Sequence, residues 1–194
     1  MSESWDQYAA GWDTNETVIL YAEKAYKTLI DIINPAGLDV LDFGCGTGLL
    51  TEKIAANANH VLALDPSVKM LEVLKNKRLK NVETLSLELS QHAIKTNHFL
   101  QTQFDLIVAS SVCAFVPDYE ATLQLLKSLL KPKGIFVQWD WQQTESDSDF
   151  GFTKTMIETS FVNANLAVLS VSEVFSFASD KGEMQVLMGA AQKV

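Results

Sequence analysis

Three glycines at alternate positions, Gly44, Gly46 and Gly48, are the residues whose spacing most directly suggests ligand binding. They follow a short apolar run at 39–43 and precede a stretch with helical spacing that begins at residue 49. A glycine has no Cβ, so a ligand can approach its backbone closely, and the first turn of a helix offers unpaired N–H groups. The pattern predicts a ligand-binding turn between a strand and a helix, with a purely structural glycine turn as the alternative.

The aspartate just before this turn, Asp42, indicates the charge of the ligand. A dinucleotide-binding turn has the spacing G-x-G-x-x-G and receives a pyrophosphate, whereas this turn has the spacing G-x-G-x-G. A carboxylate beside the loop would repel phosphates, but it suits a ligand that carries an ammonium and a sulfonium group. The turn therefore favours a cationic ligand over a dinucleotide.

A second carboxylate, Asp65, ends the next apolar run and is followed by Pro66. A carboxylate at that strand end can accept hydrogen bonds from both hydroxyls of a ribose. Taken alone, Asp65 would serve equally well as a turn or helix-capping residue. The glycine turn upstream favours the ribose role.

Apolar runs and helical patterns alternate along the chain, which predicts a doubly wound α/β domain with a mostly parallel sheet and helices on both faces. Strands are expected at 39–43, 60–64, 82–87, 104–110 and 135–139, and helices at 18–33, 49–58, 67–77, 119–130 and 153–163, with Ser67 as an N-cap. Two longer runs, 166–177 and 184–191, predict a C-terminal antiparallel hairpin that closes the sheet. We expect a single domain over 1–194.

The net charge and the composition of the chain argue against several classes of binding partner. The net charge of −9 argues against a nucleic-acid partner, because such proteins gather Lys and Arg into basic patches, and the basic cluster at 75–80 is short. Cys45 and Cys113 have no metal-ligand spacing, so we expect no metal site. Neither a signal segment nor a membrane-spanning run is evident, which predicts a cytoplasmic protein with no membrane partner. The sequence does not indicate an oligomeric state.

The segment from about residue 40 to residue 140 resembles the seven-stranded, class I S-adenosylmethionine-dependent methyltransferases, particularly the small-molecule group with the pattern V-L-D-x-G-C-G-T-G. The resemblance implies a Rossmann-like sheet, S-adenosylmethionine as the cofactor, and methyl transfer to a small-molecule acceptor. It also implies that Asp65 holds the ribose, with Pro66 beside it, and that the methionine part is surrounded by Asp42, Gly44, Cys45, Gly46 and Gly48.

Further cofactor contacts follow from the same resemblance. Met70 would lie against the adenine, although it is an equally good helix-core residue. Glu88 and Leu89 would meet the adenine edge, where the family has Gly-Asp and this chain has Leu87 and Glu88. Ala109 and Ser110 would lie beside the methionine part.

The N-terminal segment 1–15 is similar to the aromatic and acidic opening of small-molecule methyltransferases, which folds over the cofactor as a lid. Tyr8 and Trp12 are the expected contacts. A frayed terminus is the alternative, and this density of aromatic residues disfavours it.

No residue is assigned as a catalytic base. Asp140 is the candidate, because it ends the fifth predicted strand and would face the same crevice as the cofactor. His92 and His98 fall in a polar stretch and are expected to be solvated, and Phe115 stands where many relatives carry a histidine. Trp141 is either an aromatic wall or cation–π face for a planar or cationic acceptor, or ordinary packing.

Three functions stay open at this point: a small-molecule methyltransferase, a methyltransferase that acts on protein or RNA, and a non-catalytic nucleotide-binding module. The acidic charge favours the first over the second. The spacing of the glycine turn disfavours a nicotinamide cofactor in the third.

Overall fold

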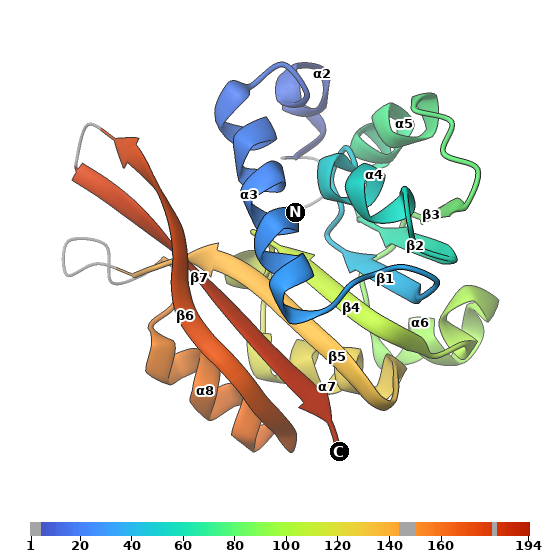
Figure 1. Ribbon diagram of the computed structural model, residues 1–194. Coiled ribbons are helices and arrows are strands. Elements are labelled where there is room, and N and C mark those ends of the chain that lie inside the picture. The colour runs from blue at the N-terminus through green and yellow to red at the C-terminus, as the bar shows by residue number, and fades with distance from the viewer. Residues whose placement is uncertain (1–4, 144–149, 180–181) are drawn as a thin grey trace.

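In the computed structural model, a seven-stranded sheet lies at the centre with helices on both faces (Figure 1). The structure describes residues 5–143, 150–179 and 182–194. The strands lie in the order β3-β2-β1-β4-β5-β7-β6; β1 to β5 are parallel, and β7 is antiparallel to β5 and β6. The predicted fold class, a doubly wound sheet with a C-terminal antiparallel hairpin, is confirmed.

The strands are β1 (Asp39–Phe43), β2 (His60–Leu64), β3 (Val82–Leu85), β4 (Phe104–Ser110), β5 (Leu130–Trp141), β6 (Leu166–Ser179) and β7 (Gly182–Lys193). The helices are α2 (Ala9–Trp12), α3 (Glu16–Ile32), α4 (Leu49–Ala55), α5 (Val68–Asn76), α6 (Gln91–Thr96), α7 (Tyr119–Leu129) and α8 (Lys154–Asn163), with short 3-10 turns η1 (His98–Gln101) and η2 (Cys113–Phe115). Residues 1–4 of the predicted lid, most of the polar stretch at 142–150, and 180–181 between the hairpin strands lie outside the described residues.

Alternate residues of the parallel strands point to opposite faces of the sheet, and both sets are apolar. Val40 and Val108 pack in one core with residues of α3 and α4. Leu41 and Ile107 pack in the other with residues of α7 and α8. Burial on both faces therefore explains why these strands are continuous apolar runs.

Polar side chains set where several helices begin. Ser67 accepts a hydrogen bond from the Met70 N–H at 3.2 Å, which confirms it as the N-cap of α5. Asn15 caps α3 by accepting from the N–H groups of Thr17 and Val18. The caps fix the starts of the two helices that flank the site described below.

Two helices, α2 and α6, were not predicted. α6 and η1 occupy the polar stretch that contains His92 and His98, for which no helix was predicted. Ser90 caps α6 by accepting from the Ala93 N–H, but no residue of α6 is buried. Of its six residues, Ala93 and Ile94 pack partly against the core, and this apolar pattern is too short for the sequence to indicate a helix.

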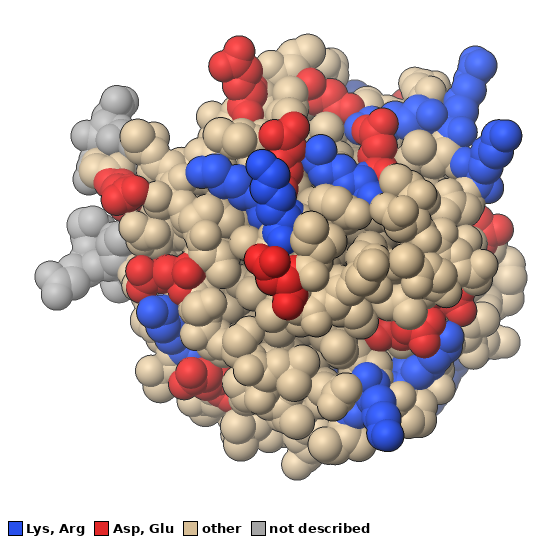
Figure 2. Space-filling view, in the orientation of Figure 1, with Lys and Arg blue, Asp and Glu red and all other residues tan. Residues whose placement is uncertain are grey.

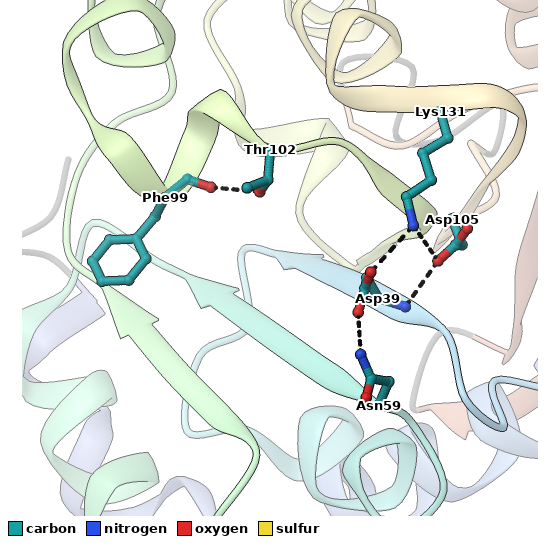
Figure 3. A network of polar contacts seen from close by, with 6 residues as sticks. All are labelled: Asp39, Asn59, Phe99, Thr102, Asp105 and Lys131. Atoms are coloured by element: carbon teal, nitrogen blue, oxygen red, sulfur yellow. Dashed lines mark hydrogen bonds and ion pairs between the residues drawn. The ribbon is translucent and has the colours of Figure 1, made fainter.

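A closed polar network joins the amino ends of the central strands (Figure 3). Lys131 Nζ lies 3.1 Å from Asp39 Oδ2 and 2.8 Å from Asp105 Oδ2. The Asp39 N–H donates to Asp105 at 3.0 Å, and Asn59 Nδ2 donates to Asp39 Oδ1 at 2.6 Å. Nearby, Thr102 Oγ1 donates to the Phe99 carbonyl. The network ties β1, β4 and the start of β5 together at the edge opposite the glycine turn.

Candidate functional site

A cavity of about 470 Å³ lies at the carboxyl ends of the central strands, within the size range of small-molecule sites. β1 has β2 on one side and β4 on the other, so the order of strands reverses at β1, where open α/β sheets bind ligands. The lining comes from the N-terminal segment, α3, the glycine turn, the ends of β2 and β3, the turn after β4 and the end of β5. Its residues include Trp5, Trp12, Val18, Tyr21, Ala22, Asp42, Gly44, Cys45, Gly46, Thr47, Asp65, Pro66, Met70, Leu87, Glu88, Leu89, Ser110, Ser111, Val112, Phe115 and Trp141.

The three glycines of the turn have different roles, although all have positive φ (72°, 53° and 81°). A Cβ on Gly44 would lie 2.3 Å from Val112 Cγ2, and one on Gly48 would lie 2.3 Å from Leu74 Cδ1, so both glycines allow close packing. A Cβ on Gly46 would meet only Trp12 Nε1, at 4.0 Å. Gly46 therefore keeps space open inside the cavity, as a turn that cradles a ligand requires.

Asp42 lies at the base of the turn and is 1% exposed. Its Oδ2 accepts a hydrogen bond from Thr51 Oγ1 at 2.6 Å. Burial raises its pKa to about 7; the Thr51 hydrogen bond opposes this effect and the charge of Asp65 adds to it. No Lys, Arg or His of the described chain lines this cavity. Asp42 is therefore a buried acid with no cationic partner within the described protein.

Asp65 holds the glycine turn against the start of α5. Its Oδ2 accepts from the Gly46 N–H at 2.9 Å, and its Oδ1 accepts from the Ser67 N–H at 2.8 Å. Burial raises its pKa, and the two backbone hydrogen bonds oppose the rise. A carboxylate has about four lone-pair sites, so both oxygens keep capacity for further donors such as hydroxyls.

Most of the predicted cofactor contacts line this cavity. The residues that do so are Asp42, Gly44, Cys45, Gly46, Asp65, Pro66, Met70, Glu88, Leu89, Ser110 and Trp12. Gly48, Ala109 and Tyr8 are not among the described lining residues. Ala109 is buried within the sheet and pairs with Phe43. Burial also raises the pKa of the Cys45 thiol, so it stays protonated.

The described part of the N-terminal segment covers the cavity through two tryptophans, Trp5 and Trp12. Asp6 fastens it to α5, because its Oδ1 accepts from Ser67 Oγ at 2.5 Å and from the Lys69 N–H at 3.3 Å. Tyr8 is 52% exposed, and its ring centroid lies 6.0 Å from that of Trp5 and 6.4 Å from that of Trp12. Trp5 also meets Phe115 with ring centroids 5.1 Å apart.

Asp140 is buried behind the cavity wall and is not among its described lining residues. One oxygen accepts from Gln138 Nε2 at 3.0 Å, and the other accepts from the Ala114 N–H at 3.4 Å. Burial raises its pKa to about 8. The structure therefore gives Asp140 a role in holding the turn after β4. His92 and His98 are exposed on α6 and η1.

Several lining residues were not predicted, above all Tyr21, Ser111 and Trp5. Tyr21 is 7% exposed, and its ring centroid lies 5.4 Å from that of Trp141. Ser111 has a φ of 56°, unusual for a residue with a side chain. The helical pattern at 18–33 predicted which side of α3 is buried. It did not predict that the first residues on this side line a cavity.

Comparisons with known proteins agree with this geometry. A family model described as a methyltransferase domain matches residues 41–136. The ubiquinone biosynthesis O-methyltransferase of Haemophilus ducreyi is 31% identical over 102 residues, 51% of this chain and 43% of that protein. The protein of the same name from Actinobacillus pleuropneumoniae is 31% identical over 126 residues, 55% of this chain and 52% of that protein. The chain spans about half the length of the curated relatives it matches.

Solved structures share the whole fold at low sequence identity. A SAM-dependent methyltransferase from Aquifex aeolicus has a TM-score of 0.70 at 22% identity, with 87% of this chain and 88% of that chain covered. The complex of DhpI with SAH has a TM-score of 0.75 at 21% identity, with 98% and 94% covered. The N-methyltransferase NodS from Bradyrhizobium japonicum, in complex with S-adenosyl-L-homocysteine, has a TM-score of 0.73 at 16% identity, with 99% and 97% covered.

The seven-stranded sheet with antiparallel β7, and the glycine turn at the end of β1, define the class I methyltransferase fold. Residues 41–136 match a methyltransferase-domain model, and the described chain has the fold of S-adenosylmethionine-dependent methyltransferases. Within the described residues, no helix is long and apolar enough to cross a membrane.

Proposed function

We propose that this protein binds S-adenosylmethionine in the cavity and transfers its methyl group to a small-molecule acceptor that enters the same cavity. The observation that carries the proposal is that one continuous cavity has two chemically different ends. One end contains the glycine turn, Asp42 and Asp65. The other end, between α3 and Trp141, contains no charged side chain among the described lining residues.

The residues at the first end fit S-adenosylmethionine. Asp42 supplies the negative charge for the cationic methionine part, and the backbone of Gly46 leaves room for it. Asp65 accepts from the ribose hydroxyls, with Pro66 beside it. Met70, Glu88 and Leu89 surround the adenine.

The residues position the reactants for an in-line displacement. When bound, S-adenosylmethionine would supply a methyl carbon for the acceptor atom to attack, while its C–S bond breaks and the sulfur keeps the electron pair as a neutral thioether. Holding the three atoms in line supplies much of the acceleration. A hydroxyl or amine acceptor loses its proton to water, since no residue of the described lining is assigned as a base.

Three observations support a small acceptor. Trp5 and Trp12 of the segment proposed as a lid, 1–15, cover the cavity and limit what can enter. On the face shown in Figure 2, basic and acidic side chains are interspersed, and no continuous basic stripe for nucleic acid is visible. The curated relatives are named as O-methyltransferases of ubiquinone biosynthesis. A single domain over 1–194 and a cytoplasmic location stay predictions.

The test supplies the purified protein with S-adenosylmethionine labelled in its methyl group and a cell extract separated into small molecules, protein and RNA. We expect S-adenosylhomocysteine to form and label to enter the small-molecule fraction. The Asp65→Ala variant is the control for reactions of the extract alone. Label in protein or RNA would refute the small-molecule proposal, and failure to bind either cofactor form in a calorimetric titration would refute the methyltransferase proposal.

A further inference from the structure

The end of the cavity between α3 and β5 has the buried hydroxyl of Tyr21 and the half-buried hydroxyl of Ser111 in a largely apolar wall. We call it the acceptor end and define it by Val18, Tyr21, Ala22, Ser111 and Trp141. The Tyr21 and Trp141 rings meet at 5.4 Å and are inclined by 60°. Phe175 and Phe177 pack against the Tyr21 ring from β6, with centroids 5.2 and 6.0 Å away. These contacts hold the Tyr21 ring in place.

The hydroxyl of Tyr21 has no hydrogen-bond partner among the described residues, although it is buried. Ser111 lies beside it without meeting hydrogen-bond geometry, and its effect on the pKa of Tyr21 is smaller than that of the Asp140 charge. Burial raises the pKa of Tyr21 well above its usual value, so the phenol keeps its proton and can both donate and accept. Buried polar groups are nearly always paired in native proteins, so an unpaired one on a cavity wall points to a ligand.

The residues of the acceptor end offer no charged side chain that could pair with an ionic acceptor. No Lys, Arg or His lines the described cavity, so a carboxylate or phosphate would be buried without a partner. Burial raises the pKa of Asp140 to about 8, and its two oxygens already accept from Gln138 and from the Ala114 N–H, outside the described lining of the cavity. The nearest ammonium, on Lys24, already lies over the Phe177 ring at 4.5 Å and donates to the Ser176 carbonyl.

We propose that the acceptor is an uncharged molecule with a flat apolar ring that lies against Trp141, and that its hydroxyl is recognised by Tyr21 with Ser111. The inference rests on the proposed function, because it assumes that the glycine-turn end is filled by the cofactor. It makes Tyr21 a specificity-determining residue. Aromatic walls on α3 and β5 suit a planar ring, and one hydroxyl pair suits one polar substituent.

The test measures binding of four small probes to protein saturated with S-adenosylhomocysteine, by ligand-detected NMR titration. The probes are p-cresol, toluene, p-toluate and p-methylbenzylamine, which share a ring and differ in one substituent. We expect p-cresol to bind about tenfold or more tightly than the toluate and the amine, because neither ion has a partner. The Tyr21→Phe variant should bind p-cresol about three- to tenfold more weakly, as the loss of one hydrogen bond predicts, and its affinity for toluene should be unchanged.

Tyr26→Phe is the matched control, because Tyr26 lies on the same helix and its hydroxyl accepts from Asn57 outside the described cavity lining. We expect this variant to bind all four probes as the natural protein does. The proposal would be overturned if the toluate or the amine bound more tightly than p-cresol, or if p-cresol did not bind at millimolar concentration. It would also be overturned if Tyr21→Phe bound p-cresol as tightly as the natural protein does. The affinity for S-adenosylhomocysteine, measured separately, tests the proposed function, so the two failures are distinguishable.

Discussion

Strand β1 carries an aspartate at each end, and the pKa values of the two carboxyl groups move in opposite directions. Asp39, at the amino end, is part of the network of Figure 3; its hydrogen bond from Asn59 and the nearby Lys131 hold its pKa below the usual value. Asp42, three residues later, is buried at the glycine turn and its pKa rises to about 7. The same strand therefore holds one acid beside its partners and a second acid that has no cationic partner among the described residues.

This difference in pKa distinguishes the edge of the sheet that has a structural role from the edge that carries the candidate site. The charges at the amino edge are satisfied within the protein, since Lys131 lies within 3.1 Å of both Asp39 and Asp105. At the carboxyl edge, Asp42 is buried without a cationic partner among the described residues, and a cationic ligand would offset the cost of its ionisation. A strongly perturbed acid in a cleft is a mark of a functional site.

The largest expected effect is on stability, from Asp42→Asn. The folded-state pKa of Asp42, about 7, is above its unfolded value of 3.8. Its ionisation therefore favours unfolding increasingly as the pH rises from about 4 to about 7, and the full penalty is reached above 7. Because a tenfold change in a proton-binding equilibrium corresponds to about 1.4 kcal/mol, the asparagine should stabilise the ligand-free protein by up to about 4 kcal/mol at pH 8.

Urea unfolding of both proteins at a series of pH values measures this gain. The control is the same comparison near pH 4, where the natural Asp42 is protonated in the folded state and the two proteins should differ little. A gain that does not change with pH, or a variant that is less stable at pH 8, would contradict the account of Asp42 as a buried unpaired acid.

The next largest effect is on cofactor affinity, from Asp65→Ala. The substitution removes the acceptor proposed for the ribose and the hydrogen bonds to Gly46 and Ser67 that shape the turn. Loss of two charge-assisted hydrogen bonds predicts about 100-fold weaker binding of S-adenosylhomocysteine. Calorimetry measures the affinity and circular dichroism checks the fold. Asp105→Ala, at the amino edge, is the matched control and should leave the affinity unchanged.

A smaller effect is the pH dependence of that affinity. An ammonium on the ligand pairs with ionised Asp42, so below its pKa of about 7 the carboxyl must lose a proton when the ligand binds. Affinity for S-adenosylhomocysteine should therefore fall up to about tenfold for each pH unit below 7 and level off above it. In Asp42→Asn the affinity should be lower and nearly independent of pH across that range. A profile shared by both proteins would assign the titration to another group.

Sequence patterns predicted the residues at the carboxyl ends of the strands better than the residues that surround them, and the reason is physical. β1, β2 and β4 are buried on both faces, so their apolar runs have sharp ends, and Asp42 and Asp65 stand at those ends. Tyr21 was missed because periodicity separates buried from exposed residues and does not separate a core residue from a cavity wall. Asp140 also ends a buried strand, but its side chain is turned toward Ala114, which only tertiary contacts decide.

The smallest effect should come from breaking the amino edge, with Lys131→Met. Lys131 bridges Asp39 and Asp105, but its side chain is 37% exposed, and water and salt screen the pair. We expect a loss of less than about 1 kcal/mol in the free energy of unfolding, largest at low salt, with no change in the affinity for S-adenosylhomocysteine. Loss of the bridge should also let the pKa of Asp39 rise toward its usual value, which an NMR titration of the carboxyl carbon measures. A change in cofactor affinity larger than the change in stability would mean that the two edges of the sheet are coupled, and that the contrast between Asp39 and Asp42 does not separate structure from function.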